Sequence, residues 1–227
     1  VREMTKYRRN CLKPAPAWKG ETPLFFNDYM NCLWANPSDE LLLPLIDAVA
    51  EAGAEGFCID AGWFGEKGKD WGRPMGDWIP SPDRFGPGGL QGIIDYIRSK
   101  GMRAGLWIEF EACCPDSAFF KNEDDCFLCR HGKRIGGDRA MLDFRNEKVR
   151  TYMHEVFDRL IGMGVTYFKN DYNQTTALGD DKHTESAADG LLEHVRALYT
   201  FIDEVLSKHP DVIIENCSGG GLRGDYG

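Results

Sequence analysis

The stretch Val165-Thr166-Tyr167-Phe168-Lys169-Asn170-Asp171-Tyr172-Asn173 decides the fold. Four β-forming residues run directly into a polar ending, in which Lys169 and Asp171 are two residues apart. Because side chains alternate across a strand, Lys169, Asp171 and Asn173 would share one face. An apolar run that ends in clustered charge is typical of the carboxyl end of a barrel strand, where catalytic groups emerge. Taken alone, the pattern also fits a lysine–aspartate pair at the end of an ordinary strand.

Four further apolar runs end in polar residues in the same manner. They cover 23–26, 56–60, 102–109 and 212–217, and their polar endings are Asn27, Asp60, Glu109 and Glu215 to Cys217. Helical spacing of apolar residues predicts helices between them, at about 37–52, 91–100, 147–162 and 186–208. Asn36 is the expected N-cap of the first helix, with Pro37 as its first helical residue. Strands that alternate with helices predict a parallel sheet with crossover connections.

This sheet is predicted to belong to a barrel and not to a nucleotide-binding fold. No GxGxxG turn follows the first strand, and 219–221 has neither the spacing nor the lysine of a phosphate loop. We therefore predict an α/β fold, a (β/α)8 TIM barrel that is incomplete in this chain, with about five βα units. Residues 1–21 are expected to be a connector entering the domain, and 22–227 the N-terminal part of the catalytic barrel. Residues 64–87 should form a long functional loop, and 110–140 should be irregular.

The composition excludes several classes of protein. With 227 residues, 42% of them hydrophobic, the chain can bury a sizeable core. Its formal net charge of −9 argues against a nucleic-acid partner or an anionic membrane surface. No apolar run approaches the length of a membrane helix, and no signal peptide opens the chain. The start Val1-Arg2-Glu3 is not a natural one, so we expect a piece of a longer protein.

The eight cysteines do not have the spacing of a secreted disulfide framework. Cys126 and Cys129 form a CxxC pair, whereas a structural zinc site needs four converging ligands. Because only this pair has ligand-type spacing, we predict reduced thiols, a cytoplasmic location, no metal and no cofactor. Whether Cys126 and Cys129 bind a metal stays open.

Five motifs, taken together and in order, resemble those of glycoside hydrolase family 36. The resemblance covers about residues 22–227. The motifs are Asp60-x-Gly62-Trp63, Gly105-Leu106-Trp107-x-Glu109, Leu142-Asp143-Phe144, Lys169-x-Asp171-x-Asn173 and Cys217-x-x-Gly220-Gly221-x-Arg223-x-Asp225.

This resemblance implies a retaining hydrolase that acts on terminal α-linked galactose-type sugars through a covalent glycosyl-Asp171 intermediate. Asp171 matches the nucleophile, and Lys169 matches the lysine that binds sugar hydroxyls. The other residues expected to bind substrate are Asp28 (where the alignment is loose), Asp60, Trp63, Trp107, Arg139, Asn173, Cys217 and Gly220. The implied partner is an oligosaccharide or another α-galactoside, with no nucleic acid and no membrane, while assembly into a homo-oligomer stays open.

The two carboxyl groups of a retaining mechanism have different requirements. A nucleophile must be ionised, and the neighbouring Lys169 is expected to favour the charged form of Asp171. A general acid must hold a proton, but Arg223 would favour the ionised form of Asp225. We therefore predict a supporting role for Asp225, and the resemblance implies an acid/base located after Gly227.

Three other hypotheses stay open. Ala61 stands where the family usually has a second sugar-binding acid, so an α-N-acetylgalactosaminidase or another α-hexosidase is an alternative. A barrel fragment that binds carbohydrate without turnover is another. A metal-dependent barrel hydrolase would use His154, His183 or His194, but these are predicted to lie on helices or in a loop and not at strand ends.

Overall fold

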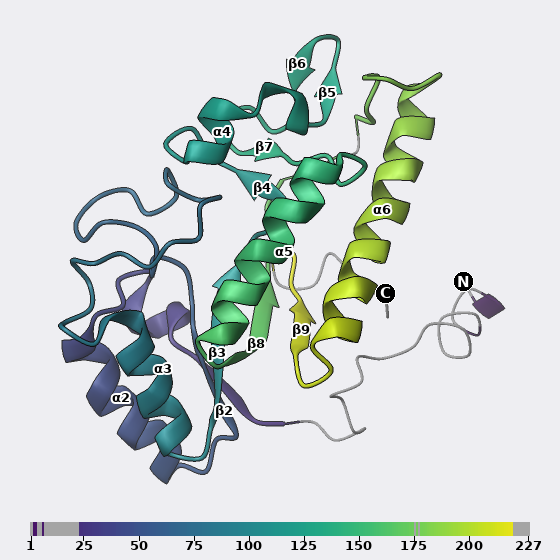
Figure 1. Ribbon diagram of the computed structural model, residues 1–227. Coiled ribbons are helices and arrows are strands. Elements are labelled where there is room, and N and C mark those ends of the chain that lie inside the picture. Colours follow the sequence, from purple (N-terminus) through teal and green to yellow (C-terminus); the bar gives the residue numbers. More distant parts are fainter. Residues whose placement is uncertain (1, 4–5, 7–22, 175, 177, 220–227) are drawn as a thin grey trace.

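A curled sheet of five parallel strands forms the centre of the molecule (Figure 1). The computed structural model describes residues 2–3, 6, 23–174, 176 and 178–219. The strands, in their order across the sheet, are β1 (Phe25–Asn27), β2 (Gly56–Ile59), β3 (Arg103–Ile108), β8 (Val165–Asn170) and β9 (Ile213–Asn216). Neighbouring strands follow one another along the chain, as in a barrel. The predicted incomplete (β/α)8 barrel with five strands is therefore confirmed.

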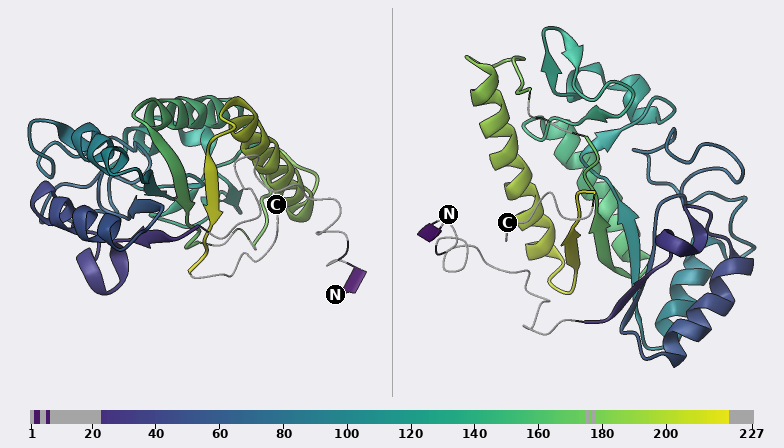
Figure 2. Two further views of the ribbon diagram at one scale, coloured as in Figure 1. Left: turned by 90° about the horizontal axis from the view of Figure 1, so that it is seen from below. Right: turned by 180° about the vertical axis from the view of Figure 1, so that it is seen from behind.

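Helices cover the outer side of the curled sheet, as both views in Figure 2 show. These helices are α2 (Asp39–Glu51), α3 (Gly89–Ser99), α5 (Glu147–Gly162) and α6 (Ala187–Lys208). Their buried apolar stripes pack on outward-facing strand residues. For example, the rings of Phe157 on α5 and Phe168 on β8 have centroids 4.8 Å apart. Asn146 is the N-cap of α5, since its side chain accepts a hydrogen bond from the Lys148 N–H.

The predicted start of the first helix is wrong by two residues. Ser38, with an extended backbone, is the N-cap of α2, and its carbonyl accepts the first helical N–H from Leu42. Asn36 cannot serve because its side-chain oxygen accepts a hydrogen bond from Arg84. The carbonyl of Pro37 accepts from the same guanidinium, so tertiary contacts hold both residues outside the helix.

The strand register places every second residue inside the barrel. Trp107, Lys169 and Glu215 are paired partners on β3, β8 and β9, so they form one row on the inner face. Deeper in the barrel, the rings of Phe25 and Tyr167 stack with centroids 4.0 Å apart. A polar row near the carboxyl edge thus lies above an aromatic layer.

The aromatic layer depends on a glycine, and we expect Gly105→Ala to destabilise the full-length protein. A Cβ at Gly105 would lie 2.6 Å from the Tyr167 ring and 3.3 Å from the Cys58 Cα. Overpacking of this kind costs about 1–3 kcal/mol, so the unfolding midpoint should fall by several degrees. The matched control is Gly92→Ala on α3, where no atom lies within 4 Å of the new Cβ. An equal or higher midpoint for Gly105→Ala than for Gly92→Ala would contradict the inner-face packing.

Residues 110–145 form an additional layer beyond the carboxyl edge, where irregular structure was predicted. The short elements are β4 (Ala112–Cys113), α4 (Ala118–Asn122), η2 (Asp124–Cys126), β5 (Cys129–Arg130), β6 (Lys133–Arg134) and β7 (Ala140–Met141). β4 pairs antiparallel with β7, and β5 with β6. Strands of two residues are too short to show a period in the sequence, which explains why the prediction failed.

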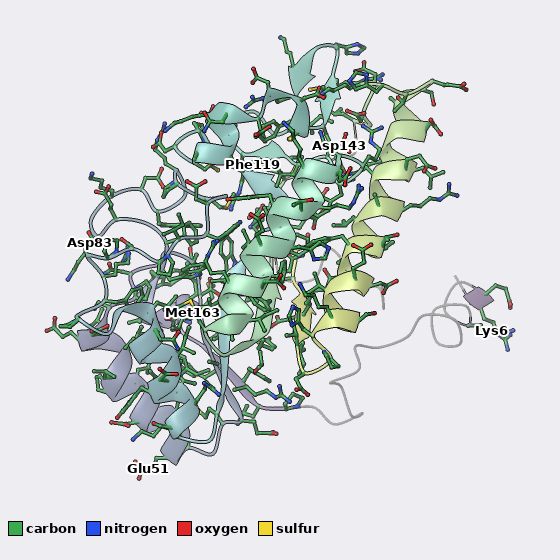
Figure 3. All side chains as sticks on the ribbon, viewed as in Figure 1. Lys6, Glu51, Asp83, Phe119, Asp143 and Met163 are labelled. Atoms are coloured by element: carbon green, nitrogen blue, oxygen red, sulfur yellow. The ribbon has the colours of Figure 1, made fainter. Side chains whose placement is uncertain are left out.

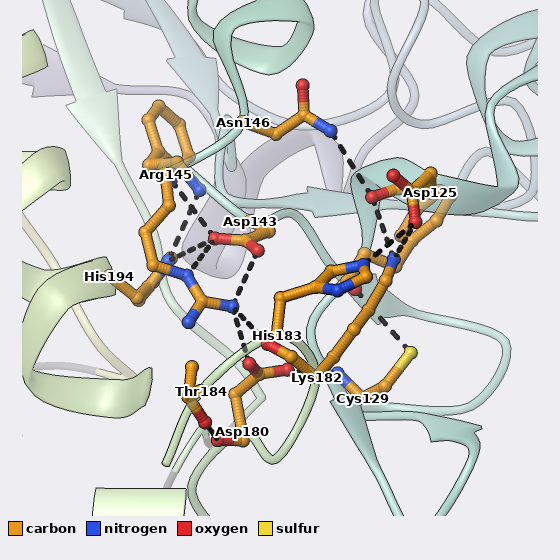
Figure 4. A network of polar contacts seen from close by, with 12 residues as sticks. Asp125, Cys129, Asp143, Arg145, Asn146, Asp180, Lys182, His183, Thr184 and His194 are labelled. Atoms are coloured by element: carbon orange, nitrogen blue, oxygen red, sulfur yellow. Dashed lines mark hydrogen bonds and ion pairs between the residues drawn. The ribbon is translucent and has the colours of Figure 1, made fainter. Parts of the chain in front are cut away.

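A buried ionic network ties this layer to the segment before α6 (Figure 4). The Arg145 guanidinium donates to Asp143 at 2.7 Å and also to Asp180, whose second oxygen accepts from the Cys129 N–H at 2.6 Å. Burial raises the pKa of Asp143, but hydrogen bonds from His194 and Arg145 outweigh it and hold that pKa below its usual range. The network therefore consists of charged groups that partner one another.

Cys126 and Cys129 belong to the additional layer, and His154 and His194 lie on helices α5 and α6. Cys126 and Cys129 are free, and burial raises the pKa of both. His154 on α5 faces Glu204, His183 faces Asp125, and the buried His194 accepts from the Phe144 N–H. Within the described part of the chain, we found no group of three or more metal-ligating side chains. Among the same residues, no helix has both the length and the apolar character needed to cross a bilayer.

Candidate active site

The candidate site lies at the carboxyl edge of the sheet. Asp60, Glu109, Asp171 and Cys217 each follow β2, β3, β8 or β9 directly. In Figure 3, Phe119 and Asp143 lie in the upper part, and both come after a strand end. Glu51 and Met163 lie below them, and both precede a strand. Side chains that are far apart in sequence therefore meet at one edge.

Hydrogen-bond donors from three strand ends converge on Asp171. The Asn173 side chain donates to Oδ2 at 2.8 Å and the Trp107 indole donates to the same oxygen at 3.3 Å. The N–H groups of Tyr172 and Gly219 donate to Oδ1 at 2.9 and 3.3 Å. Burial raises the pKa of Asp171, but bonds from Asn173, Tyr172, Cys217 and Trp107 outweigh it and lower that pKa overall. The carboxylate is thus ionised at neutral pH, as a nucleophile must be.

Lys169 does not contact Asp171, so the predicted cause of this ionisation is wrong. The Lys169 ammonium donates to Asp60 Oδ2 at 2.7 Å, and the Asn27 side chain donates to the same oxygen at 2.5 Å. Burial lowers the pKa of Lys169, but the bond to Asp60 outweighs it and raises that pKa. Asp171 and the Lys169–Asp60 pair are therefore adjacent units with separate partners.

Asp28 is a buried carboxyl that is hydrogen-bonded to the backbone of Asp60. It is 2% exposed, and its Oδ1 accepts from the Asp60 N–H at 2.7 Å. Its Oδ2 is buried, with no hydrogen-bond partner among the described residues. Burial raises the pKa of Asp28 to about 7, with a further contribution from the nearby Asp60 charge. In this geometry Asp28 holds the backbone of Asp60, and its expected contact with substrate stays a prediction.

We expect Asp28→Asn to reduce the loss of stability at high pH. A folded-state pKa of about 7 lies above the ordinary 3.8, so folding favours the protonated form. The contribution of Asp28 to stability is then present below about pH 4 and is lost as the pH rises toward 7, by at most about 4 kcal/mol. An asparagine is neutral throughout this window. Unfolding midpoints of the full-length protein, measured from pH 4.5 to 8, should fall less in the variant. Parallel curves for the variant and the parent protein would contradict this prediction.

Four tryptophans pack together beside Asp171. Trp63 has no exposed surface, and its indole donates to the Trp107 carbonyl at 3.0 Å. Trp71 and Trp78 have ring centroids 5.6 and 6.0 Å from that of Trp107. Trp107 reaches Asp171 with its indole N–H. Trp63 is fully buried, and its expected contact with sugar stays a prediction.

Glu109 was not among the residues predicted to form the site. Its buried carboxylate accepts from the Asn173 N–H, the Asn173 side chain and the Arg139 guanidinium, at 3.0, 3.0 and 2.5 Å. Burial raises the pKa of Glu109, against the opposing effect of Arg139. Arg139 and Asn173, both expected to bind substrate, thus meet at this group. The alternation Gly105, Trp107, Glu109 could have identified it as an inward-facing residue.

Cys217 is the site residue that follows β9. Its N–H donates to the Asn170 carbonyl at 2.8 Å, and its side chain is hydrogen-bonded to Asp171. Gly220, Arg223 and Asp225 lie outside the described residues, so the expectations for them stay predictions. The structure brings together Asp28, Asp60, Trp107, Arg139, Lys169, Asp171, Asn173 and Cys217.

At the carboxyl edge of this parallel barrel, the ionised Asp171 lies beside a half-buried lysine that is paired with a buried aspartate. The sequence model of the melibiase family matches residues 2–227, so the chain belongs to this family. This match also confirms the resemblance to glycoside hydrolase family 36.

Relatives and solved structures of this family are similar over most of the chain. Alpha-galactosidase AgaA of Geobacillus stearothermophilus is 31% identical over 91% of this chain and 29% of its own length. Alpha-galactosidase Mel36A of Lactobacillus acidophilus is 27% identical over 84% of this chain and 26% of its own. The crystal structure of a GH36 AgaA variant with stachyose has a TM-score of 0.83 at 29% identity, over 97% of this chain and 31% of that one. The chain thus spans about three tenths of the length of the relatives it matches.

Proposed function

We propose that the full-length protein hydrolyses terminal α-linked galactose-type sugars with retention of configuration, through a glycosyl ester on Asp171. The observation that carries this proposal is the set of donors around Asp171, which keep it ionised at the carboxyl edge of the barrel. The named relatives, which are α-galactosidases, support the choice of sugar. The AgaA structures with stachyose and raffinose support an oligosaccharide as substrate.

In the first step of this reaction, an Asp171 oxygen attacks the anomeric carbon as the glycosidic C–O bond breaks. A general acid gives its proton to the departing oxygen. In the second step, the same group takes a proton from water, which attacks the anomeric carbon and releases Asp171. The Lys169–Asp60 pair offers an ammonium and a carboxylate to sugar hydroxyls beside the nucleophile.

The acid/base is proposed to come from a later strand. It should lie about 5–5.5 Å from the nucleophile. Of the carboxyls described at this edge, Glu109 is held by Arg139 and Asn173, and Asp60 by Lys169. Glu215 lies one row below Asp171, in register with Lys169. Azide rescue of Glu215→Ala and Asp225→Ala, with an activated aryl leaving group, would identify either residue as the acid/base; we expect no rescue at either.

A galactose bearing a 2-acetamido group, or another α-hexoside, is the second candidate substrate. The observation that favours it is Ala61, which is buried beside Asp60 and offers no side-chain hydrogen bond to a sugar. Aryl α-glycosides assayed on the full-length protein separate the candidates, and NMR of the first-formed anomer tests retention. We expect the highest kcat/KM on the α-galactoside. Binding without turnover on any member of the panel would favour a carbohydrate-binding protein without hydrolase activity.

A further inference from the structure

Glu109 is a buried acid whose carboxylate accepts three hydrogen bonds. Its side chain is 1% exposed, and both of its oxygens accept hydrogen bonds. Oε1 accepts from the Asn173 N–H, and Oε2 accepts from the Asn173 side-chain nitrogen and from Arg139. One carboxylate therefore holds both the backbone and the side chain of Asn173.

The Asn173 amide joins two carboxylates. Its nitrogen lies 3.0 Å from Glu109 Oε2 and 2.8 Å from Asp171 Oδ2, and an amide nitrogen carries two hydrogens. A flipped side chain would turn its carbonyl oxygen toward both negative groups, so the two carboxylates fix the orientation of the amide. Asn173 is otherwise an exposed side chain that would be free to rotate.

We propose that Glu109 is a positioning residue for the nucleophile, because it fixes the Asn173 amide that donates to Asp171. This inference rests on the proposed function. Glu109 is not the acid/base in this arrangement, since three donors require acceptor oxygens and an acid must give up a proton. Arg139 completes the unit, because its guanidinium donates to the same Glu109 oxygen, Oε2, as the Asn173 side chain.

The other ionisable groups near Asp171 come from neighbouring elements. Lys169 on β8 is held by Asp60 after β2, and Cys217 follows β9. The Glu109 carboxylate, held by Arg139, also lies close enough to interact with the Asp171 charge. Asn173→Ala keeps all of these groups, so we assign a shift in the ionisation of Asp171 in that variant to the amide bond.

The test is a double-mutant cycle in the full-length protein, made of Glu109→Gln, Asn173→Ala and the double variant. A glutamine presents an N–H group to the donors of Asn173 or Arg139, so the Asn173 amide loses its fixed orientation. Each single variant should lower kcat/KM for an activated aryl α-galactoside by about ten- to a hundredfold. The double variant should be no slower than Asn173→Ala alone, because the two residues act on Asp171 along one path.

A pH profile separates positioning from general structural support. Loss of the amide donor raises the pKa of Asp171, so the acid limb of kcat/KM should move to higher pH in Asn173→Ala, which keeps the Glu109 charge. Glu109→Gln also removes a negative charge near Asp171, which lowers the same pKa, so its acid limb should move less. Asp180→Asn is the control, since Asp180 is also a fully buried acid but is bound to Arg145. It should lower the unfolding midpoint, leave the acid limb in place and combine multiplicatively with Asn173→Ala.

Several results would overturn the proposal. Multiplicative losses for Glu109→Gln and Asn173→Ala would show independent roles, and azide rescue of Glu109→Ala would make Glu109 the acid/base. If Glu109→Gln does not fold, Asn173→Ala still decides, because an acid limb unchanged from the parent protein would remove the link to Asp171. Turnover retained by Asp171→Asn would instead reject the proposed function itself.

Discussion

Asp171→Asn should abolish nearly all turnover in the full-length protein while the unfolding midpoint stays close to that of the parent protein. An amide cannot form the glycosyl ester, and it presents an N–H group to the donors that now converge on the carboxylate. We expect kcat/KM to fall by at least about a thousandfold, which corresponds to about 4 kcal/mol of barrier.

Two measurements check this prediction. Asp95→Asn on the exposed face of α3 is the matched control and should keep the activity of the parent protein. Mass spectrometry after reaction with a slowly released activated galactoside should find the sugar on the peptide that contains Asp171. A label on another carboxylate, or a variant with more than about a tenth of the original rate, would reject Asp171 as the nucleophile.

Lys169→Met should lower both the free energy of unfolding and the activity. We expect its effect to be the second largest, after that of Asp171→Asn. The change leaves Asp60, which is 3% exposed, without its ammonium partner and next to the buried Asp28. Breaking a buried pair by removing one partner costs about 3–5 kcal/mol. Lys169 is the proposed partner of sugar hydroxyls, so its loss should also lower kcat/KM by about a hundredfold or more.

A second variant separates the two effects of Lys169. Lys169→Met combined with Asp60→Asn removes both charges, so it should regain much of the stability but none of the activity. Lys208→Met is the surface control, because Lys208 and its partner Asp158 are both exposed and such pairs contribute about 0–1 kcal/mol. If the double variant recovers turnover, Lys169 stabilises the fold and does not bind the sugar.

The barrel could be predicted because its strands carry a local signal. Each strand is an apolar run that ends in a polar residue, and the period of two fixes which residues face inward, as for Lys169 and Asp171. The residues that gather at the edge follow from this rule alone, since parallel strands align their carboxyl ends.

The partners of these residues could not be predicted, because they depend on contacts between strands far apart in sequence. Lys169 lies two residues from Asp171 but binds Asp60, 109 residues away. Asn36 is a residue type that favours the N-cap position, but its side-chain oxygen accepts a hydrogen bond from Arg84 instead. Trp63 ends a strand motif but is covered completely by rings from the following loop. In each case a tertiary contact overrides the local preference.

The tryptophan cluster also gives the site an optical signal of its own. Trp63, Trp71, Trp78 and Trp107 have ring centroids about as far apart as the rings are wide, so their electronic transitions couple and should produce a distinct near-ultraviolet circular dichroism band. The Trp107 indole donates to Asp171, the proposed nucleophile, so we expect its emission to depend on the charge of that carboxylate. Esterification or protonation of that carboxylate would therefore change the fluorescence of the protein without any added dye.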